Sequence, residues 1–197
     1  AEPGYERPAD LESVHELRDF TAVSAEGGWR STIVPGYFEV SVTVNERYRD
    51  DVRVGVNGET LRLGIASGIG SVSGRFEARI AMPSLSRVEI DGGADVTIER
   101  FELHDLFLEI DGAAKVEAVD TELNELDVDV DGAATIDFSR SSVVNARVDL
   151  DGAARLSVRM AGGELTGELS GVGEVTYSGD VSREAIRVEG LGRVRRQ

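Results

Sequence analysis

Apolar and polar residues alternate through much of the chain, and the alternating pattern recurs at a fixed interval. The segment "VEIDGGADV" begins at Val88, and "LEIDGAAKV", "VDVDGAATI" and "VDLDGAARL" follow at 20-residue spacing, from Leu108, Val128 and Val148. Strict alternation predicts a strand with one buried face, and these windows lack the i, i+3, i+4 spacing of a helix. The pattern therefore predicts an all-β protein built from repeats.

Each repeat has the same residue types at the same positions: an acidic residue, an aliphatic residue, a turn ending in glycine, and then small residues. The turn glycines are Gly92, Gly112, Gly132, Gly152, Gly171 and Gly190. Like residues that return at this interval are expected to lie side by side on parallel strands, about 4.8 Å apart. The sequence thus predicts a single-domain right-handed parallel β-helix, a solenoid of about 20 residues per coil.

The N-terminal part follows a different pattern. In "ADLESVHELRDF", the apolar residues Leu11, Val14 and Leu17 have helical spacing, and Asp10 is a candidate N-cap. We expect a short helix that covers the open end of the first coil. The predicted organisation is an N-terminal extension with this cap helix over residues 1–19 and one β-helix domain over residues 20–197. Degenerate coils occupy residues 20–87 and regular Asp-Gly-Ala coils occupy residues 88–197.

Composition narrows the classes of function. With 21 basic and 37 acidic residues the formal charge is −16, which disfavours nucleic acid as a partner. The chain has no cysteine, and no apolar run is long enough for a membrane span. It begins with Ala-Glu-Pro, as expected for the residues that remain after a signal peptide is cleaved at a small-residue site. We therefore expect an exported protein of the periplasm, the cell surface or the medium.

Several segments together carry a family resemblance. They are "DFTAVSAEGG", "DDVRVGVNGETLRLGI" and "MPSLSRVEIDGGADV", followed by the "DGAA" repeats and "LSGVGEVTYSGD". From about Asp19 onward the chain resembles the "putative auto-transporter adhesin, head GIN domain" family of bacterial exported proteins. The family commonly has Ser-Gly-Ala at the corners, whereas this chain has Asp-Gly in four repeats and Ser170-Gly171 in one. The resemblance implies a right-handed β-helix and no established catalytic residues.

The most prominent candidate site is acidic. Two outward columns of carboxylates are expected on one face: Glu89, Asp91, Glu109, Asp111, Asp129, Asp131, Asp149 and Asp151. Paired carboxylates suit calcium, which takes six to eight oxygen ligands. Alternatively, the Asp residues bond the turn amides while the other column is a solvated face. Nearby Arg87, Lys115, Arg147 and Arg155 would then soften the repulsion. We favour the second interpretation and expect no cofactor, with calcium as the one metal candidate.

Enzymatic function has less support. His15 and His104 are the two histidines, they lie in separate parts of the chain, and no Gly-x-Ser-x-Gly motif is present. We therefore predict a non-enzymatic binding or adhesion module whose ligand, a glycan or a protein, lies outside the cell or in its envelope. The alternative is a polysaccharide-active lyase or hydrolase on a β-helix scaffold, by analogy with that fold.

The C-terminal end predicts one further partner. The last coil has an open edge with no helix after it, and arginines surround the apolar residues Val188, Leu191 and Val194. Open edges are usually covered in natural proteins. We therefore predict a homodimer through the C-terminal coil, with two-fold symmetry.

Overall fold

The computed structural model describes residues 9–66 and 74–197, which are almost entirely β-structure. The strands are β1 (Asp10–His15), β2 (Ala22–Glu26), β3 (Arg30–Pro35), β4 (Glu39–Asn45), β5 (Val52–Asn57), β6 (Thr60–Ile65), β7 (Phe76–Met82), β8 (Arg87–Glu99), β9 (Glu102–Ala161), β10 (Glu164–Asp180) and β11 (Arg183–Arg196). One 3-10 helix, η1 (Glu46–Asp51), precedes β5. All the strands belong to one sheet.

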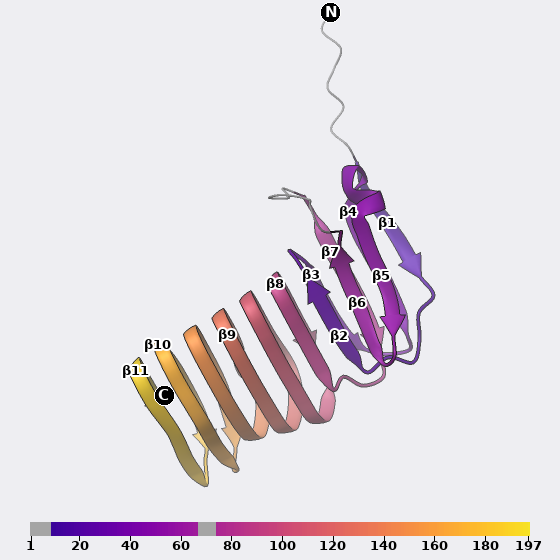
Figure 1. Ribbon diagram of the computed structural model, residues 1–197. Helices are drawn as coiled ribbons and strands as arrows, with labels where there is room; N and C mark the ends of the chain where they lie inside the picture. The colour runs from indigo at the N-terminus through magenta and orange to yellow at the C-terminus, as the bar shows by residue number, and fades with distance from the viewer. Residues whose placement is uncertain (1–8, 67–73) are drawn as a thin grey trace, which may run out of the picture.

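The sheet is mixed, and its two ends differ in strand direction (Figure 1). At the N-terminal end, β1 pairs with β4, β4 with β7, and β5 with β6, each antiparallel. The β5–β6 hairpin turns at Gly58-Glu59, where Gly58 has a φ of +61° that suits a tight hairpin turn. Toward the C-terminus, β8, β9, β10 and β11 pair in parallel, in that order.

The repeats lie side by side in register. Glu89 on β8 pairs with Glu109 on β9, and Asp149 on β9 pairs with Glu168 on β10. Within the long β9, the corner glycines stack directly: a Cβ atom built on Gly132 would overlap the carbonyl oxygen of Gly112. Gly132 also has a φ of +131°, which residues other than glycine rarely adopt. Each corner thus needs glycine for two separate reasons.

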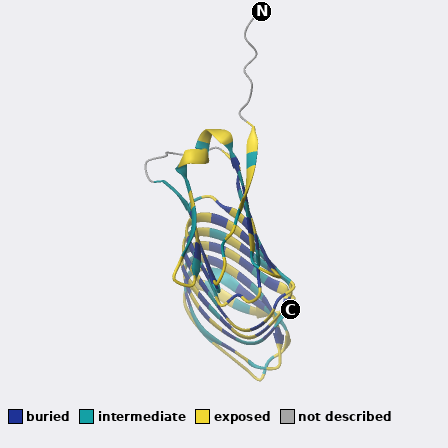
Figure 2. Ribbon diagram, turned by 90° about the vertical axis from the view of Figure 1, so that its right-hand side faces the viewer, coloured by how far each residue is buried: buried dark blue, intermediate teal, exposed yellow. Residues whose placement is uncertain are grey.

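Alternation along each strand separates the core from the surface. The residues before the corners, Ile90, Ile110, Val130, Leu150 and Leu169, are all at most 2% exposed. Figure 2 shows buried, intermediate and exposed residues alternating along the strands of the curved sheet. Trp29 and Phe20, which are also buried, fill the interior nearer the N-terminus. The core is therefore continuous along the sheet.

The predicted fold class is wrong in the type of β-architecture and in the N-terminal cap helix. The protein is all-β, but the described residues form a nearly closed, barrel-like mixed sheet, not a right-handed parallel β-helix. The antiparallel pairs of β1, β4, β5, β6 and β7 overturn that prediction. The error came from extending the 20-residue repeat into residues 20–87, where its spacing is already lost.

The predicted cap helix is also absent. Residues 10–15 form strand β1, whose residues pair with β4 from Asp10–Asn45 to His15–Val40. The spacing of Leu11, Val14 and Leu17 does not mark a buried face, because Val14 is 67% exposed. A helix of this length is marginal without tertiary packing, whereas the edge of β4 offers β1 a full row of hydrogen-bonding partners. Residues 1–8 of the predicted extension lie outside the described residues.

Candidate functional site

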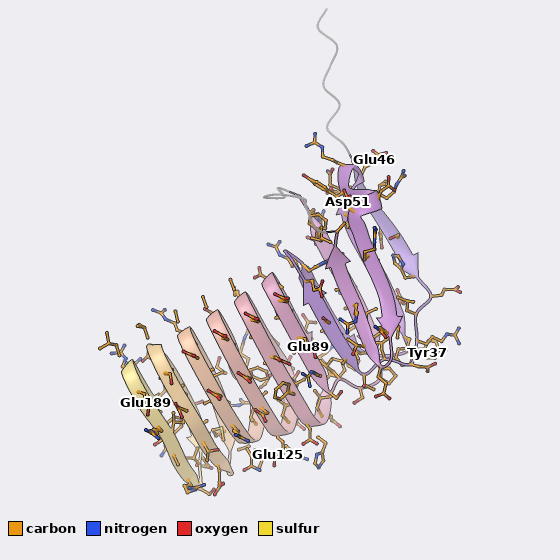
Figure 3. The ribbon with its side chains drawn as sticks, viewed as in Figure 1. Tyr37, Glu46, Asp51, Glu89, Glu125 and Glu189 are labelled. Carbon is orange, nitrogen blue, oxygen red and sulfur yellow. The ribbon has the colours of Figure 1, made fainter. Side chains whose placement is uncertain are left out.

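The eight acidic residues singled out in the sequence lie together on one face, hereafter the acidic face. Glu89, Glu109, Asp129 and Asp149 form one outward row, and Asp91, Asp111, Asp131 and Asp151 form the next, with buried aliphatic residues between the rows. Figure 3 labels Glu89 on β8 and Glu189 on β11, at the two ends of the array of repeats. The parallel register thus places like charges beside one another at strand spacing.

Like charges lie close enough on this face to affect one another at its centre. The pKa of Asp129 is raised, first by burial and then by the charges of Asp149 and Glu109. At the β8 end, Arg87 relieves the repulsion: its Nε lies 2.6 Å from Oε1 of Glu89, and its guanidinium also contacts Glu109. Arg147 makes no ion pair within the part of the chain that the structure describes.

The acidic face does not gather its carboxylates around a point. Among residues 9–66 and 74–197, no three His, Asp or Glu side chains converge in a way that could hold a metal ion. The rows run straight across the strands, so each carboxylate faces its like neighbours instead of a shared centre. The arrangement favours a solvated acidic face, and the calcium candidate stays an untested prediction.

A groove runs beside the acidic face, on the other side of the corners, and we call it the corner groove. It has a volume of about 1430 Å³. One row of small or apolar residues lines it: Gly93, Ala113, Ala133, Ala153, Val172 and Leu191. A second row, two positions further along each strand, is polar: Asp95, Lys115, Thr135, Arg155, Glu174 and Arg193. Trp29, Arg30, Arg75, Phe76 and Glu77 line its N-terminal end, with Gly28 and Gly74. The small residues between the two rows also line it: Ala94, Ala114, Ala134, Ala154, Gly173 and Gly192.

Most charges at the two ends of the corner groove are paired. Nε of Arg30 lies 4.0 Å from Asp95, and Nη2 of Arg75 lies 2.8 Å from Glu77. The hydrogen bond from Arg75 lowers the pKa of Glu77. At the other end, Glu174 accepts from Arg193 at 3.1 Å and lies 2.8 Å from Nε of Arg195.

The middle of the groove is different. Lys115 and Arg155 make no ion pair and no hydrogen bond with any residue in the described ranges. From the sequence, both were expected to soften the acidic face. The structure instead places them across the corner, in the polar row of the groove with Thr135 between them. The groove was not predicted from the sequence, although the polar residue that follows each "GAA" segment indicates a polar row at this position.

The two histidines lie on strands that are not paired with each other. His15 is the last residue of β1, where its Nε2 lies 3.0 Å from the hydroxyl of Ser13. His104 belongs to β9, with its side chain 79% exposed and its Nδ1 3.1 Å from Asp105. The structure therefore does not bring the histidines together with each other or with the corner groove. Within the described ranges, no helix has the length and apolar character needed to cross a membrane.

Comparison with solved structures shows the same fold in other bacterial proteins. A "putative adhesin" from Bacteroides fragilis superposes with a TM-score of 0.75 at 16% identity, covering 96% of this chain and 99% of that one. A "putative lipid binding protein" from Parabacteroides distasonis gives 0.58 at 16% identity, covering 95% and 96%. A "putative adhesin" from Parabacteroides merdae gives 0.52 at 15% identity, with the same coverage. At these identities the likeness concerns the fold alone.

Sequence comparison supplies the family. No protein of curated function matches the chain significantly. A family model described as "Putative auto-transporter adhesin, head GIN domain" matches residues 19–159, which is more than half of the chain, and confirms the resemblance found in the sequence. The chain therefore belongs to the family described as "Putative auto-transporter adhesin, head GIN domain".

Proposed function

We propose that the protein is a non-enzymatic binding module of the adhesin type, and that the corner groove is its binding surface. The observation that carries this proposal is the continuity of the groove. It begins at β3 and β7 and crosses β8, β9 and β10 to reach β11. A long surface built from repeated strands suits an extended partner better than a small substrate.

The acidic face supports binding over catalysis. Glycoside hydrolysis uses two carboxylates in distinct environments, one of them held as a proton donor. Here the carboxylates recur in uniform rows, without a distinct pair. Asp129 differs from its neighbours in its raised pKa. The polysaccharide-active lyase or hydrolase is therefore the second candidate.

The names of the structural neighbours agree with a binding function, and they suggest where the protein acts. We propose that the protein acts in the periplasm or at the cell surface, where an adhesin meets its partner. The neighbours from Bacteroides fragilis and Parabacteroides merdae are named as adhesins, and the one from Parabacteroides distasonis as a lipid-binding protein. All three names describe binding, with no reaction stated.

A homodimer through the C-terminal strand is the one partner that we also propose for testing. In the described sheet β11 pairs only with β10, and Leu191 is 83% exposed, so this end offers a free edge. Glu184 and Arg196 oppose docking there, because they occupy the core-facing positions beside Leu165 and Tyr177. Light scattering at micromolar concentration decides between these effects. A dimer that Val188→Asp dissociates supports the proposal, and a strict monomer refutes it.

A blocking substitution tests the groove. Ala133 is exposed, and its row accepts larger side chains, since Val172 and Leu191 occupy it in later repeats. Ala133→Trp should therefore fold and fill the groove. Asn124→Trp, at another exposed position of β9 outside the groove, is the matched control.

Both variants and the parent are applied to an array of acidic and neutral glycans and of peptides. We expect the parent and Asn124→Trp to bind the same ligands, and Ala133→Trp to lose them. Binding that survives Ala133→Trp would contradict the assignment of the groove. Depolymerisation of a glycan that a single carboxylate substitution abolishes would favour the enzyme instead.

A further inference from the structure

We infer that the corner groove binds a polysaccharide bearing carboxylate groups, and that Lys115, Thr135 and Arg155 form its anion subsite. The inference rests on the proposed function, because it names the ligand class of the same groove. It goes further by assigning three residues that would hold the charged groups of the ligand.

The three residues occupy the same position in consecutive repeats. Residues of one repeat pair in register with those of the next, as Asp95 does with Lys115 and Arg155 with Glu174. Neighbouring strands lie about 4.8 Å apart, so Lys115 and Arg155 stand about 10 Å apart along the groove with Thr135 between them. All three side chains are exposed toward the groove.

The two cations of this trio, Lys115 and Arg155, form no ion pair in the described chain, although Asp95 and Glu174 lie beside them on the adjacent strands. Arg193 in the polar row and Arg30 at the N-terminal end of the groove are each paired with a carboxylate, whereas Lys115 and Arg155 form no such pair in the described chain. A guanidinium fork, an ammonium and a hydroxyl offer hydrogen-bond donors that suit a carboxylate. On a protein of net charge −16, this is a local site for an anion.

The floor of the groove indicates which polyanion fits. The backbone of β8, β9 and β10 is already paired strand to strand, so it offers no partners for the amides of a bound peptide. The exposed methyl groups of Ala113, Ala133 and Ala153 instead provide a flat apolar surface for the face of a sugar ring. A polysaccharide brings carboxylates without a backbone of amides to satisfy.

Nucleic acid is the less suitable polyanion. It carries a negative charge for about every 1.7 Å of duplex axis, far more than two cations can neutralise. The acidic face lies one corner away from the groove, with Asp111 and Asp131 each four residues before the trio members Lys115 and Thr135. A polysaccharide with widely spaced carboxylates brings fewer negative charges near the acidic face and is therefore repelled less.

Calorimetric titration of the full chain with polygalacturonate oligosaccharides tests the inference. Lys115→Gln and Arg155→Gln should each weaken binding about fivefold, the effect of one exposed charge pair. Arg147→Gln is the matched control, because Arg147 is exposed, unpaired within the described chain and outside the groove. It changes the net charge equally and should leave affinity unchanged. Affinity should also fall as salt rises.

Further probes separate the possible outcomes. Neutral dextran should not bind, and polyglutamate should bind more weakly than polygalacturonate. Equal loss in all three variants would mean that only net charge matters and would overturn the inference, as would preferred binding of polyglutamate. If Ala133→Trp abolishes binding to some ligand of the array while Lys115→Gln and Arg155→Gln do not, the groove stands and the anion subsite fails.

Discussion

Adding a single methyl group at Gly132 should destabilise the protein far more than an ordinary surface change. The backbone there has a φ of +131°. The new Cβ would overlap the carbonyl oxygen of Gly112 and lie 3.0 Å from the nitrogen and carbonyl carbon of the same residue. Those atoms belong to the neighbouring strand, so they cannot move aside as a flexible side chain would.

Two costs combine in Gly132→Ala. A side chain in this region of φ costs about 1–3 kcal/mol. Moving the adjacent strands apart to relieve the overlap adds a cost of similar size, so the total loss is about 3–5 kcal/mol, in the range seen for severe substitutions. For a chain of this size each kcal/mol lowers Tm by about 2–4 °C, which predicts a fall of roughly 6–20 °C.

Gly93→Ala is the matched control, because Gly93 lies just after a corner glycine in the position that Ala113 and Ala133 occupy in later repeats. A Cβ at Gly93 would meet no atom within 4 Å, and its φ lies outside the restricted range. This substitution should stabilise the protein by up to about 1 kcal/mol. Thermal and urea unfolding of both variants decide the matter. If Gly132→Ala unfolds like Gly93→Ala, the stacked-corner geometry is incorrect.

Three further predictions concern charge. The pKa of Asp129 is raised in the folded protein, so stability falls as pH rises through the window above the ordinary aspartate pKa. Because Asp129 is exposed and its charge is screened by solvent, Asp129→Asn should stabilise by only about 0.5 kcal/mol at neutral pH and low salt, and an advantage that persists at pH 3 or in high salt would contradict this. For Glu77 the pH dependence of stability is reversed, because its lowered pKa stabilises the folded protein above the ordinary glutamate pKa, and this stability is lost in acid. Arg75→Met should therefore lower Tm slightly at pH 7 and less at pH 3, and an equal fall at both would exclude the ion pair as the cause. For calcium, we expect melting curves in EDTA and in millimolar calcium to coincide, whereas a rise of about 3 kcal/mol, which mass action gives at a hundredfold excess over Kd, would establish a site.

Part of this architecture could be predicted from the sequence, because the repeat carries its own constraints. Alternation around Ile110 and Val130 fixes which side chains face outward, and the equal spacing of Glu109 and Asp129 predicts that they lie on adjacent strands. The structure places these residues as that spacing requires. The class of fold could not be predicted from the repeat, since β1, β4 and β7, and the β5–β6 hairpin, pair antiparallel through contacts that no local period encodes.

The groove was missed for a related reason. Small residues after a corner are typical of tight packing, and Ala134 and Ala154 are buried. Their neighbours Ala133 and Ala153, however, are exposed and face the groove. Alternation alone does not show whether an outward surface is convex or hollow, because the hollow depends on how sharply the chain bends at the corner glycines.

Backbone amide shifts of the 15N-labelled protein, recorded during titration with polygalacturonate oligosaccharides, test the central claim most directly. Lys115, Thr135 and Arg155, with the alanines before them, line the corner groove. The account predicts that their amides shift together and saturate with one affinity, while those of Glu109, Asp129 and Asp149 on the acidic face stay unchanged. Shifts centred on the acidic face, or none anywhere at saturating ligand, would contradict the claim that the corner groove binds an acidic polysaccharide.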